Sequence, residues 1–443
     1  MTLHSLLKSP FASAQQTPLT GLDVAFANYL QQQQPSDDSN HLWLAALTSH
    51  QWGRGHACLD LQALSTQAAE LLGWSAHDVM QLPNALAQAA ASIPWTQGNN
   101  SPLVYNAHTQ QVYLRRAWHA ETLIRHNLQQ RLAQAQTVPN DLQTRLDHLF
   151  PNAHANDKQR QACEVAARHA ITLITGGPGT GKTTTVVKLL SLLVRTAPRE
   201  LQIHLAAPTG KAAARLTESI SNALTKMPAD QRPHMPRQAQ TLHRLLQTNS
   251  RANQVHQLAT DVVVVDEASM IDLEMMARLL QAVPASARLI LLGDKDQLAS
   301  VEAGAVMSQL CTGSLLQHQT VTLIHSHRFD AKSGIGQWAR AVNAEVTDNT
   351  PALKALWNAA PDWLATLPVQ QRIDGDAPQA DVTRLQIASA HDPKLAVGLR
   401  YGWRNWLALL DAHRPSKTAP AAPCSDAQAV ALLKAFTEFC VLC

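Results

Sequence analysis

The sequence has little of several features that would assign a protein class at once. It contains no run of about 18 consecutive apolar residues, so it predicts no membrane-spanning helix. Its net charge is only +3, far from the positive excess that by itself indicates a nucleic-acid-binding protein. The opening segment, residues 1–21, fits neither a secretory signal nor an Arg-rich transit peptide. We therefore expect a cytoplasmic protein.

Cysteine is also scarce, with six residues in a chain of 443. Such thin spacing suits a reducing compartment and argues against a disulfide framework. Cys440 and Cys443 form a CxxC pair, without a second pair or a nearby histidine at ligand spacing. A zinc or redox role for this pair and a simple role as apolar helix residues are both open.

The hydrophobic pattern divides the chain into three parts. Residues 1–145 carry a helical, Gln- and Ala-rich pattern, with a short strand pair expected near residues 102–118. In residues 146–330, short and continuously apolar runs alternate with helix-length segments, which predicts an α/β domain with a parallel sheet covered on both faces. The expected strands are residues 170–175, 203–208, 261–267, 288–294 and 320–326. Pro-rich stretches, residues 225–240 and 412–426, are expected to be loops.

The segment GGPGTGKT follows the first of these strands and precedes a helical pattern. This is the required context for a phosphate-binding P-loop, in which glycines turn backbone N–H groups toward phosphate at a helix N-terminus. Lys182 is expected to reach the β and γ phosphates of ATP, and Thr183 to hold Mg²⁺. The predicted ATP-binding segment is Gly176, Gly177, Pro178, Gly179, Thr180, Gly181, Lys182, Thr183 and Thr184.

A second strand, rich in valine, ends in Asp266 and Glu267. Ligands bind at the carboxyl ends of strands in such sheets, so Asp266 is expected to bind Mg²⁺ through water and Glu267 to activate the attacking water. A helix cap is the competing interpretation. An Asp-Glu pair favours hydrolysis over phosphate transfer to a small molecule, which a P-loop kinase would catalyse.

Two further polar turns end strands of the same pattern. Gln297 follows one of them and can hydrogen-bond a γ-phosphate, although an ordinary polar turn is an equal alternative. Thr209 and Lys211 follow another, where they could bind a sugar-phosphate backbone without contacting the bases. For Lys211 and Arg215, a solvated helix face is the alternative.

Six segments in this order resemble a known family. GGPGTGKT, APTGKAA, TLHRLL, VVDEASMID, GDKDQL and LIHSHRF together resemble the first motor domain of superfamily 1 helicases, and most closely the RecD family, the α subunits of exonuclease V (RecBCD). GRGHACLDL and VYLRRAWHAE are similar to that family's N-terminal region. The resemblance implies a RecA-like fold for residues 146–330 and a partner-docking role for residues 1–145.

The resemblance implies further roles. Gln159 matches the family glutamine that contacts adenine, and Arg328 an arginine that reaches the γ-phosphate across the domain cleft. Thr241 and His243 fall in a segment associated with bound single-stranded DNA. By analogy, the protein is a 5′ to 3′ DNA helicase subunit that uses ATP and Mg²⁺, assembles with RecB-like and RecC-like subunits, and serves recombinational repair of double-strand breaks.

Residues 331–443 resemble only the beginning of the family's second motor domain. A Gln-Gly pair and a later arginine, both expected there, are not found, so the sequence predicts an incomplete second RecA-like domain in a truncated chain. Losing an arginine finger alone costs a factor of about 10³ or more in hydrolysis. The serious alternative is therefore a catalytically incomplete motor fragment that binds ATP and partners without unwinding.

Overall fold

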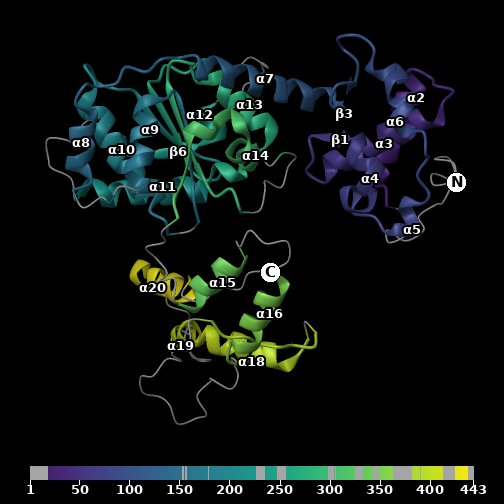
Figure 1. The fold of residues 1–443 in the computed structure, drawn as a ribbon. Helices are drawn as coiled ribbons and strands as arrows, with labels where there is room; N and C mark the ends of the chain where they lie inside the picture. The colour runs from purple at the N-terminus through teal and green to yellow at the C-terminus, as the bar shows by residue number, and fades with distance from the viewer. Residues whose placement is uncertain are drawn as a thin grey trace. The chain divides into compact units, whose positions relative to one another are not determined.

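The computed structural model divides the chain into two compact units, Met1–Arg328 and Phe329–Cys443. The described residues are 18–151, 154, 157–177, 179–225, 235–246, 256–297, 304, 306–324, 333–342, 349–362, 382–389, 391–412 and 425–437. Each unit is considered by itself (Figure 1). Among the described residues, no helix combines the length and apolar character needed to cross a bilayer.

The first unit begins with a mainly helical part that also contains a small antiparallel sheet. The expected hairpin is formed by β2 (Leu103–Asn106) and β3 (Gln111–Leu114), and β1 (Cys58–Asp60), which the sequence did not predict, pairs with β3 on its other side. The helices here are α2 (Gly21–Gln33), α3 (Ser39–Gly53), α4 (Leu61–Leu72), α5 (Ala76–Val79), α6 (Leu86–Ala89) and the 3₁₀ turns η1 (Ala90–Ser92) and η2 (Pro94–Thr96).

A buried polar network ties α2 to α3 inside this part. Asp23 is 2% exposed, and its carboxylate accepts hydrogen bonds from the Ser49 hydroxyl at 2.7 Å and from the Thr20 amide at 2.9 Å. His50 Nδ1 lies 3.4 Å from the same carboxylate, while His50 Nε2 accepts a 3.0 Å bond from the Trp74 indole. Burial pushes the pKa of Asp23 upward, but the hydrogen bonds with His50, Ser49 and Thr20 together hold it below its ordinary value.

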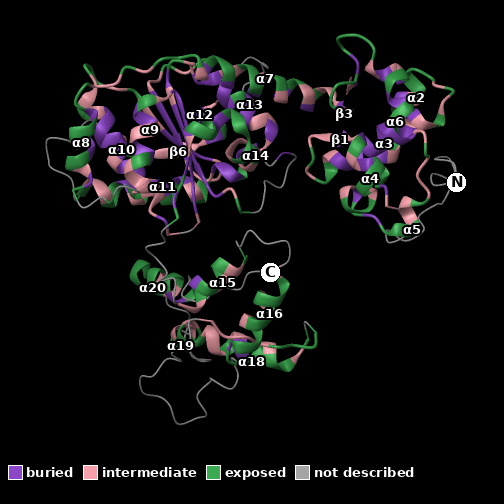
Figure 2. Cartoon of the chain, in the orientation of Figure 1, coloured by how far each residue is buried: buried purple, intermediate pink, exposed green. Residues whose placement is uncertain are grey.

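The remainder of the first unit is built on a six-stranded, all-parallel sheet with the order β6-β5-β7-β8-β4-β9. The strands expected from the sequence are confirmed, and one more, β6, lies at the edge. They are β4 (Ile171–Thr175), β5 (Ile203–Ala207), β6 (Ala239–Thr241), β7 (Val262–Val265), β8 (Arg288–Gly293) and β9 (Thr320–Thr322). Figure 2 colours the inner strands mostly as buried, and β4, β7 and β8 are buried along almost their whole length. The edge strand β6 is of intermediate burial.

Helices cover both faces of this sheet, which explains why its strands are continuously apolar. Along β7, Val263 and Val265 face one cluster of buried side chains, whereas Val262 and Val264 face another on the opposite side of the sheet. The first face is covered by α7 (Arg115–Leu132), α12 (Leu242–Leu245), α13 (Leu273–Ala282) and α14 (Val306–Thr312). The second is covered by α8 (Leu142–Leu149), α9 (Lys158–Arg168), α10 (Lys182–Thr196) and α11 (Gly210–Thr225). Two 3₁₀ turns, η3 (Ala268–Met270) and η4 (Ser314–Gln319), complete the domain.

Helix α7 connects the hairpin to the parallel sheet. It begins directly after β3, and its small and aliphatic stripe packs against α13. At its C-terminal end Arg131, 1% exposed, donates hydrogen bonds to the backbone carbonyls of Val283 and Ala287. A single helix therefore contributes to the core of the parallel-sheet domain while starting in the N-terminal part.

The second unit is mainly helical where the structure describes it, with one isolated β-bridge between Asp362 and Arg384. Its helices are α15 (Gly334–Val342), α16 (Thr350–Ala359), α18 (Pro393–Gly402), α19 (Arg404–Ala412) and α20 (Asp426–Thr437). The ring of Trp403 stacks on that of Phe436 with a centroid distance of 5.9 Å, which fixes α20 against the turn between α18 and α19.

Candidate functional site

The glycine-rich loop leaves β4 at Thr175 and enters α10 at Lys182. Gly179 and Gly181 have φ angles of 78° and 84°, in the left-handed region that glycine adopts without strain. At Gly176 the reason for glycine is space, because an added Cβ would lie 2.6 Å from the Leu323 carbonyl oxygen and 2.9 Å from Thr180 Oγ1. The loop therefore needs glycine at three positions to fold back over the end of β4.

Lys182 points into this loop. Its ammonium group donates hydrogen bonds to the carbonyl oxygens of Gly176 and Gly177, the latter at 3.2 Å. The Thr180 hydroxyl donates to the Gly177 carbonyl at 2.9 Å, so the loop is closed on itself by side chains of its own. A cation held among backbone carbonyls at a helix N-terminus is positioned to exchange those carbonyls for phosphate oxygens.

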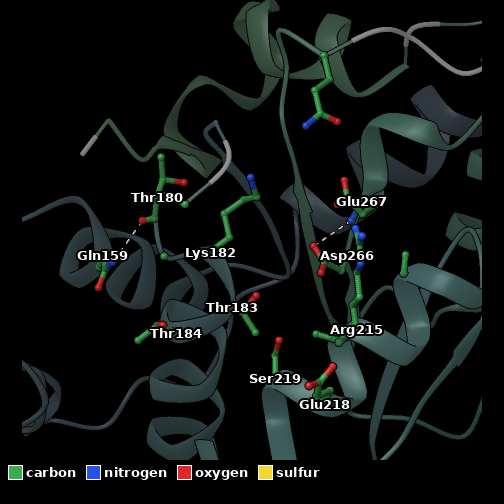
Figure 3. A pocket seen from close by; sticks show the side chains of 15 residues that line it. Gln159, Thr180, Lys182, Thr183, Thr184, Arg215, Glu218, Ser219, Asp266 and Glu267 are labelled. Atoms are coloured by element: carbon green, nitrogen blue, oxygen red, sulfur yellow. Dashed lines mark hydrogen bonds between the residues drawn. The ribbon is translucent and has the colours of Figure 1, made fainter. Parts of the chain in front are cut away.

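The acidic pair follows β7. The amide of Asp266 donates a 2.9 Å hydrogen bond to the carbonyl of Ala206 on β5, which continues the sheet by one residue. Glu267 adopts a left-handed conformation with φ 53° and ψ 40°, a strained state for a residue with a side chain. Its amide donates a 2.9 Å bond to Asp266 Oδ1. This sharp turn directs the two adjacent carboxylates differently (Figure 3).

The electrostatics of Asp266 reflect its position. Burial raises the pKa of Asp266 and the charge of Glu267 adds to this, whereas the Glu267 amide and the Lys182 charge act in the opposite direction. The net pKa lies above the ordinary value. Because burial and the neighbouring charge disfavour the ionised form of Asp266, a bound cation would stabilise this carboxylate.

Gln159 and the β8 turn complete the surroundings of the loop. Asp157 caps α9 through the amides of Gln159 and Arg160, and the Gln159 side chain donates a 3.3 Å bond to the Thr180 carbonyl. After β8, the buried Asp294 accepts a bond from the Asp296 amide, and its other oxygen lies 4.0 Å from where a Cβ of Gly177 would be. Gln297 is exposed at the end of this turn.

These elements surround one cavity with a volume of about 1060 Å³ (Figure 3). The structure brings together ten residues that the sequence predicted for nucleotide binding or hydrolysis: Gln159, Gly179, Thr180, Gly181, Lys182, Thr183, Thr184, Asp266, Glu267 and Gln297. Gly176 and Gly177 are not among the lining residues, because they form the base of the loop on which Lys182 rests.

The opposite wall of the cavity comes from α11 and was not predicted. Its lining residues are Ala212, Arg215, Leu216, Glu218 and Ser219. Their spacing of three, four and seven residues places them on one face of the helix. That spacing is visible in the sequence, but only the packing of α11 against α10 shows that this helix face lines the cavity.

The donor set fits magnesium. The Thr183 hydroxyl and the Asp266 carboxylate both line the cavity, and hard oxygen ligands of this kind, completed by phosphate oxygens and water, are those that Mg²⁺ prefers. Bound there, Mg²⁺ would neutralise charge on the phosphates.

The residues predicted to bind DNA lie at the ends of two neighbouring strands, outside the cavity lining. β5 and β6 pair in parallel, with Ala207 opposite Thr241. Thr209 Oγ1 accepts a 3.2 Å bond from the Ala212 amide and Thr241 Oγ1 a 3.3 Å bond from the Arg244 amide, so both hydroxyls cap helices. Lys211 and His243, each two residues beyond a capping threonine, are exposed.

Some sequence expectations fall outside the described residues. These are Pro178, Arg328 and the pair Cys440 and Cys443, with much of the two expected loops. Within the part of the chain that the structure describes, no group of three or more histidine, cysteine or acidic residues is arranged to hold a metal ion without other ligands.

Comparison with known proteins agrees with this architecture. Residues 15–149 match the family model of the RecBCD enzyme subunit RecD, N-terminal domain, and residues 159–303 match an AAA domain. The second match contains the loop, the acidic pair and Gln297. The first ends at Leu149, the last residue of α8.

The chain is also similar to RecD subunits of RecBCD enzymes and to a RecD2 helicase. RecBCD enzyme subunit RecD of Mycobacterium tuberculosis (strain CDC 1551) is 39% identical over 304 residues, 66% of this chain and 50% of that protein. RecBCD enzyme subunit RecD of Mycolicibacterium smegmatis is 38% identical over 374 residues, 81% of this chain and 62% of that protein. The ATP-dependent RecD2 DNA helicase of Deinococcus radiodurans is 35% identical over 190 residues, 42% of this chain and 24% of that protein. The chain thus spans about half to three fifths of the length of these RecD subunits.

Proposed function

We propose that this chain, which is related to the RecD subunits of RecBCD enzymes, is an ATP-dependent motor subunit that acts on DNA. The observation that carries the proposal is the single cavity in which Lys182, Thr183, Asp266 and Glu267 meet. A basic, phosphate-binding half and an acidic, water-activating half from separate strands are the two parts that nucleotide hydrolysis needs.

Each residue of the nucleotide site has a separate role in the proposed reaction. Gln159 recognises the adenine, and the loop from Gly176 to Gly181 presents its backbone N–H groups to the phosphates. Lys182 exchanges its loop carbonyls for β- and γ-phosphate oxygens. Glu267 accepts the proton of the attacking water, while Gln297 contacts the γ-phosphate. Arg328 supplies further positive charge to the same phosphate.

The residues proposed to contact DNA lie at the carboxyl ends of the strands, as the nucleotide cavity does. Thr209, Lys211, Thr241 and His243 lie at the carboxyl ends of β5 and β6, whose neighbour β7 ends in Asp266. Backbone amides, hydroxyls and a cation at such an edge suit a sugar-phosphate backbone. One strand would run along this edge, with net movement from 5′ to 3′.

The likeness to RecD subunits supports the assignment of partners. RecB-like and RecC-like subunits would complete a heterotrimer in the cytoplasm, with residues 1–145 as the docking element, and the assembly would serve recombinational repair of double-strand breaks. Residues 331–443 would form the beginning of the second motor domain.

Steady-state ATP hydrolysis by the chain, with and without a single-stranded oligonucleotide, tests the motor assignment. The proposal expects turnover that DNA stimulates and that Lys182→Ala removes. Turnover that does not respond to DNA would contradict the motor role.

A second candidate is a motor fragment that binds ATP and partners without unwinding. It is favoured by the sequence of residues 331–443, where neither the Gln-Gly pair nor the later arginine of the second motor domain is found. Intact affinity for ATP combined with background turnover, in the presence and absence of DNA, would favour this candidate over the first.

A further inference from the structure

The nucleotide cavity has more negative than positive charge in its described lining. Three carboxylates, those of Glu218, Asp266 and Glu267, face two cations, Lys182 and Arg215. A nucleoside triphosphate brings several further negative charges. Mg²⁺ offsets only part of them, so every fixed cation in this cavity contributes to the affinity for the terminal phosphate.

Arg215 is held in a defined place relative to the acidic pair. It lies in the second turn of α11, which starts shortly after β5 ends, and β5 is joined to Asp266 by the Ala206–Asp266 hydrogen bond. Leu216 and Ile220 on the same helix are buried in the sheet cluster and anchor it. In Figure 3 the Arg215 side chain runs from α11 toward Asp266 and Glu267.

The guanidinium of Arg215 is unengaged in the part of the chain that the structure describes. The residue is exposed, and it forms no hydrogen bond or ion pair there. Lys182, by contrast, is already bonded to two loop carbonyls. A long cation that lines a cavity and is not used for folding is available for a ligand.

We propose that Arg215 is a second phosphate contact of this site, whose guanidinium binds the terminal phosphate of the nucleoside triphosphate opposite Lys182. This inference rests on the proposed function, since it assigns a residue to the same nucleotide site. Arginine presents paired N–H donors that match two phosphate oxygens, which the point charge of lysine does not. The contact distinguishes a triphosphate from a diphosphate.

The contact also gives α11 two roles. Lys211 precedes Arg215 by one helical turn, and the helix is rigid on that scale. A terminal phosphate that holds Arg215 therefore fixes the same helix whose first turn carries Lys211, one of the residues proposed to contact DNA. Loss of the terminal phosphate on hydrolysis would release Arg215 and so remove this restraint on α11.

Equilibrium binding of ADP and of the non-hydrolysable ATP analogue AMP-PNP, each with Mg²⁺, tests the inference on the full chain. Arg215→Ala is expected to weaken AMP-PNP binding about tenfold or more, while ADP binding changes less than about twofold. Arg215→Lys is expected to recover part of the loss. Arg195→Ala, which removes an exposed arginine of α10 outside the cavity, is the matched control.

The outcomes separate the inference from the proposed function. Equal loss of both nucleotides, or no loss of either, in an Arg215→Ala chain with an unchanged thermal unfolding midpoint would overturn the role of Arg215 while leaving the nucleotide site in place. Failure of the unsubstituted chain to bind either nucleotide would instead overturn the proposed function, and this inference with it.

Discussion

The amide of Asp266 donates a 2.9 Å hydrogen bond to the carbonyl of Ala206. This bond joins the end of β7, where the acidic pair stands, to β5, which leads into α11. The acidic pair Asp266 and Glu267 follows β7, while the α11 wall of the cavity, with Thr209 and Lys211, follows the adjacent strand β5. If the proposed nucleotide and DNA sites are correct, this hydrogen bond provides a short connection between them.

Glu267→Gln is expected to separate binding from hydrolysis. The amide keeps the size of the side chain and removes the base, so ATP hydrolysis should fall by about 10²–10⁴-fold while the Kd for ATP changes little. Single-turnover hydrolysis and equilibrium binding of the same preparation provide both quantities. Hydrolysis at the unsubstituted rate would show that Glu267 does not act as the base.

Gly176→Ala is expected to disrupt the loop. The new Cβ would lie 2.6 Å from the Leu323 carbonyl oxygen. Gly176 directly follows β4 and Leu323 directly follows β9, and these strands pair, so neither backbone can move away without disturbing the sheet. ATP affinity should fall about tenfold or more and the thermal midpoint should drop. Gly210→Ala is the matched control, since a Cβ there has no atom within 4 Å. Equal behaviour of the two variants would refute the steric argument.

The positions of most strands could be predicted from the sequence. Continuous apolar runs such as Val262–Val265 are a local property, and burial on both faces preserves them. β1 and β6 escaped prediction because each has three residues without an apolar pattern. Both segments are strands because their backbones pair with a neighbouring strand, and this pairing depends on the tertiary fold and not on the local sequence.

The candidate site was predicted on one side only. Lys182, Thr183 and the acidic pair follow strands directly, so a sequence motif places them. Arg215 and Ser219 reach the same cavity because α11 packs against α10, and this depends on a strand order in which β8 and β7 separate β4 from β5. Lys211 and Arg215 are both exposed, as a solvated helix face would have them, but the sequence did not indicate that Arg215 also lines the cavity.

The Asp23 network predicts how the N-terminal part responds to acid. The pKa of Asp23 is lower in the folded chain than when unfolded, so its stabilising contribution is present above the unfolded pKa and is lost as pH falls through the folded value. Unfolding free energy should therefore decline below about pH 4. Asp23→Asn should cost about 2 kcal/mol at pH 7 and flatten this decline.

Chemical denaturation at pH 7 and pH 3.5 measures both effects. Asp37→Asn, at an exposed position, is the control and should change neither the stability nor its pH dependence. An Asp23→Asn chain that retains the full acid sensitivity would show that other carboxylates carry it.

Lys211→Ala is expected to weaken binding of a single-stranded oligonucleotide without changing ATP affinity. Removal of one phosphate contact should reduce the slope of log affinity against log salt by about 0.7. Arg278→Ala removes an exposed cation from α13 and is the control for general charge. An unchanged slope would place the DNA elsewhere.

We propose above all that the cavity beside the glycine-rich loop binds Mg²⁺-ATP through Lys182. Equilibrium binding of Mg²⁺-ATP to the unsubstituted chain and to Lys182→Ala measures this directly. We predict saturable binding by the first and an affinity at least about tenfold lower for the second, since the ammonium group is the central cation of the loop. The absence of binding by the unsubstituted chain, or equal affinities of the two, would show that this cavity does not bind ATP through Lys182.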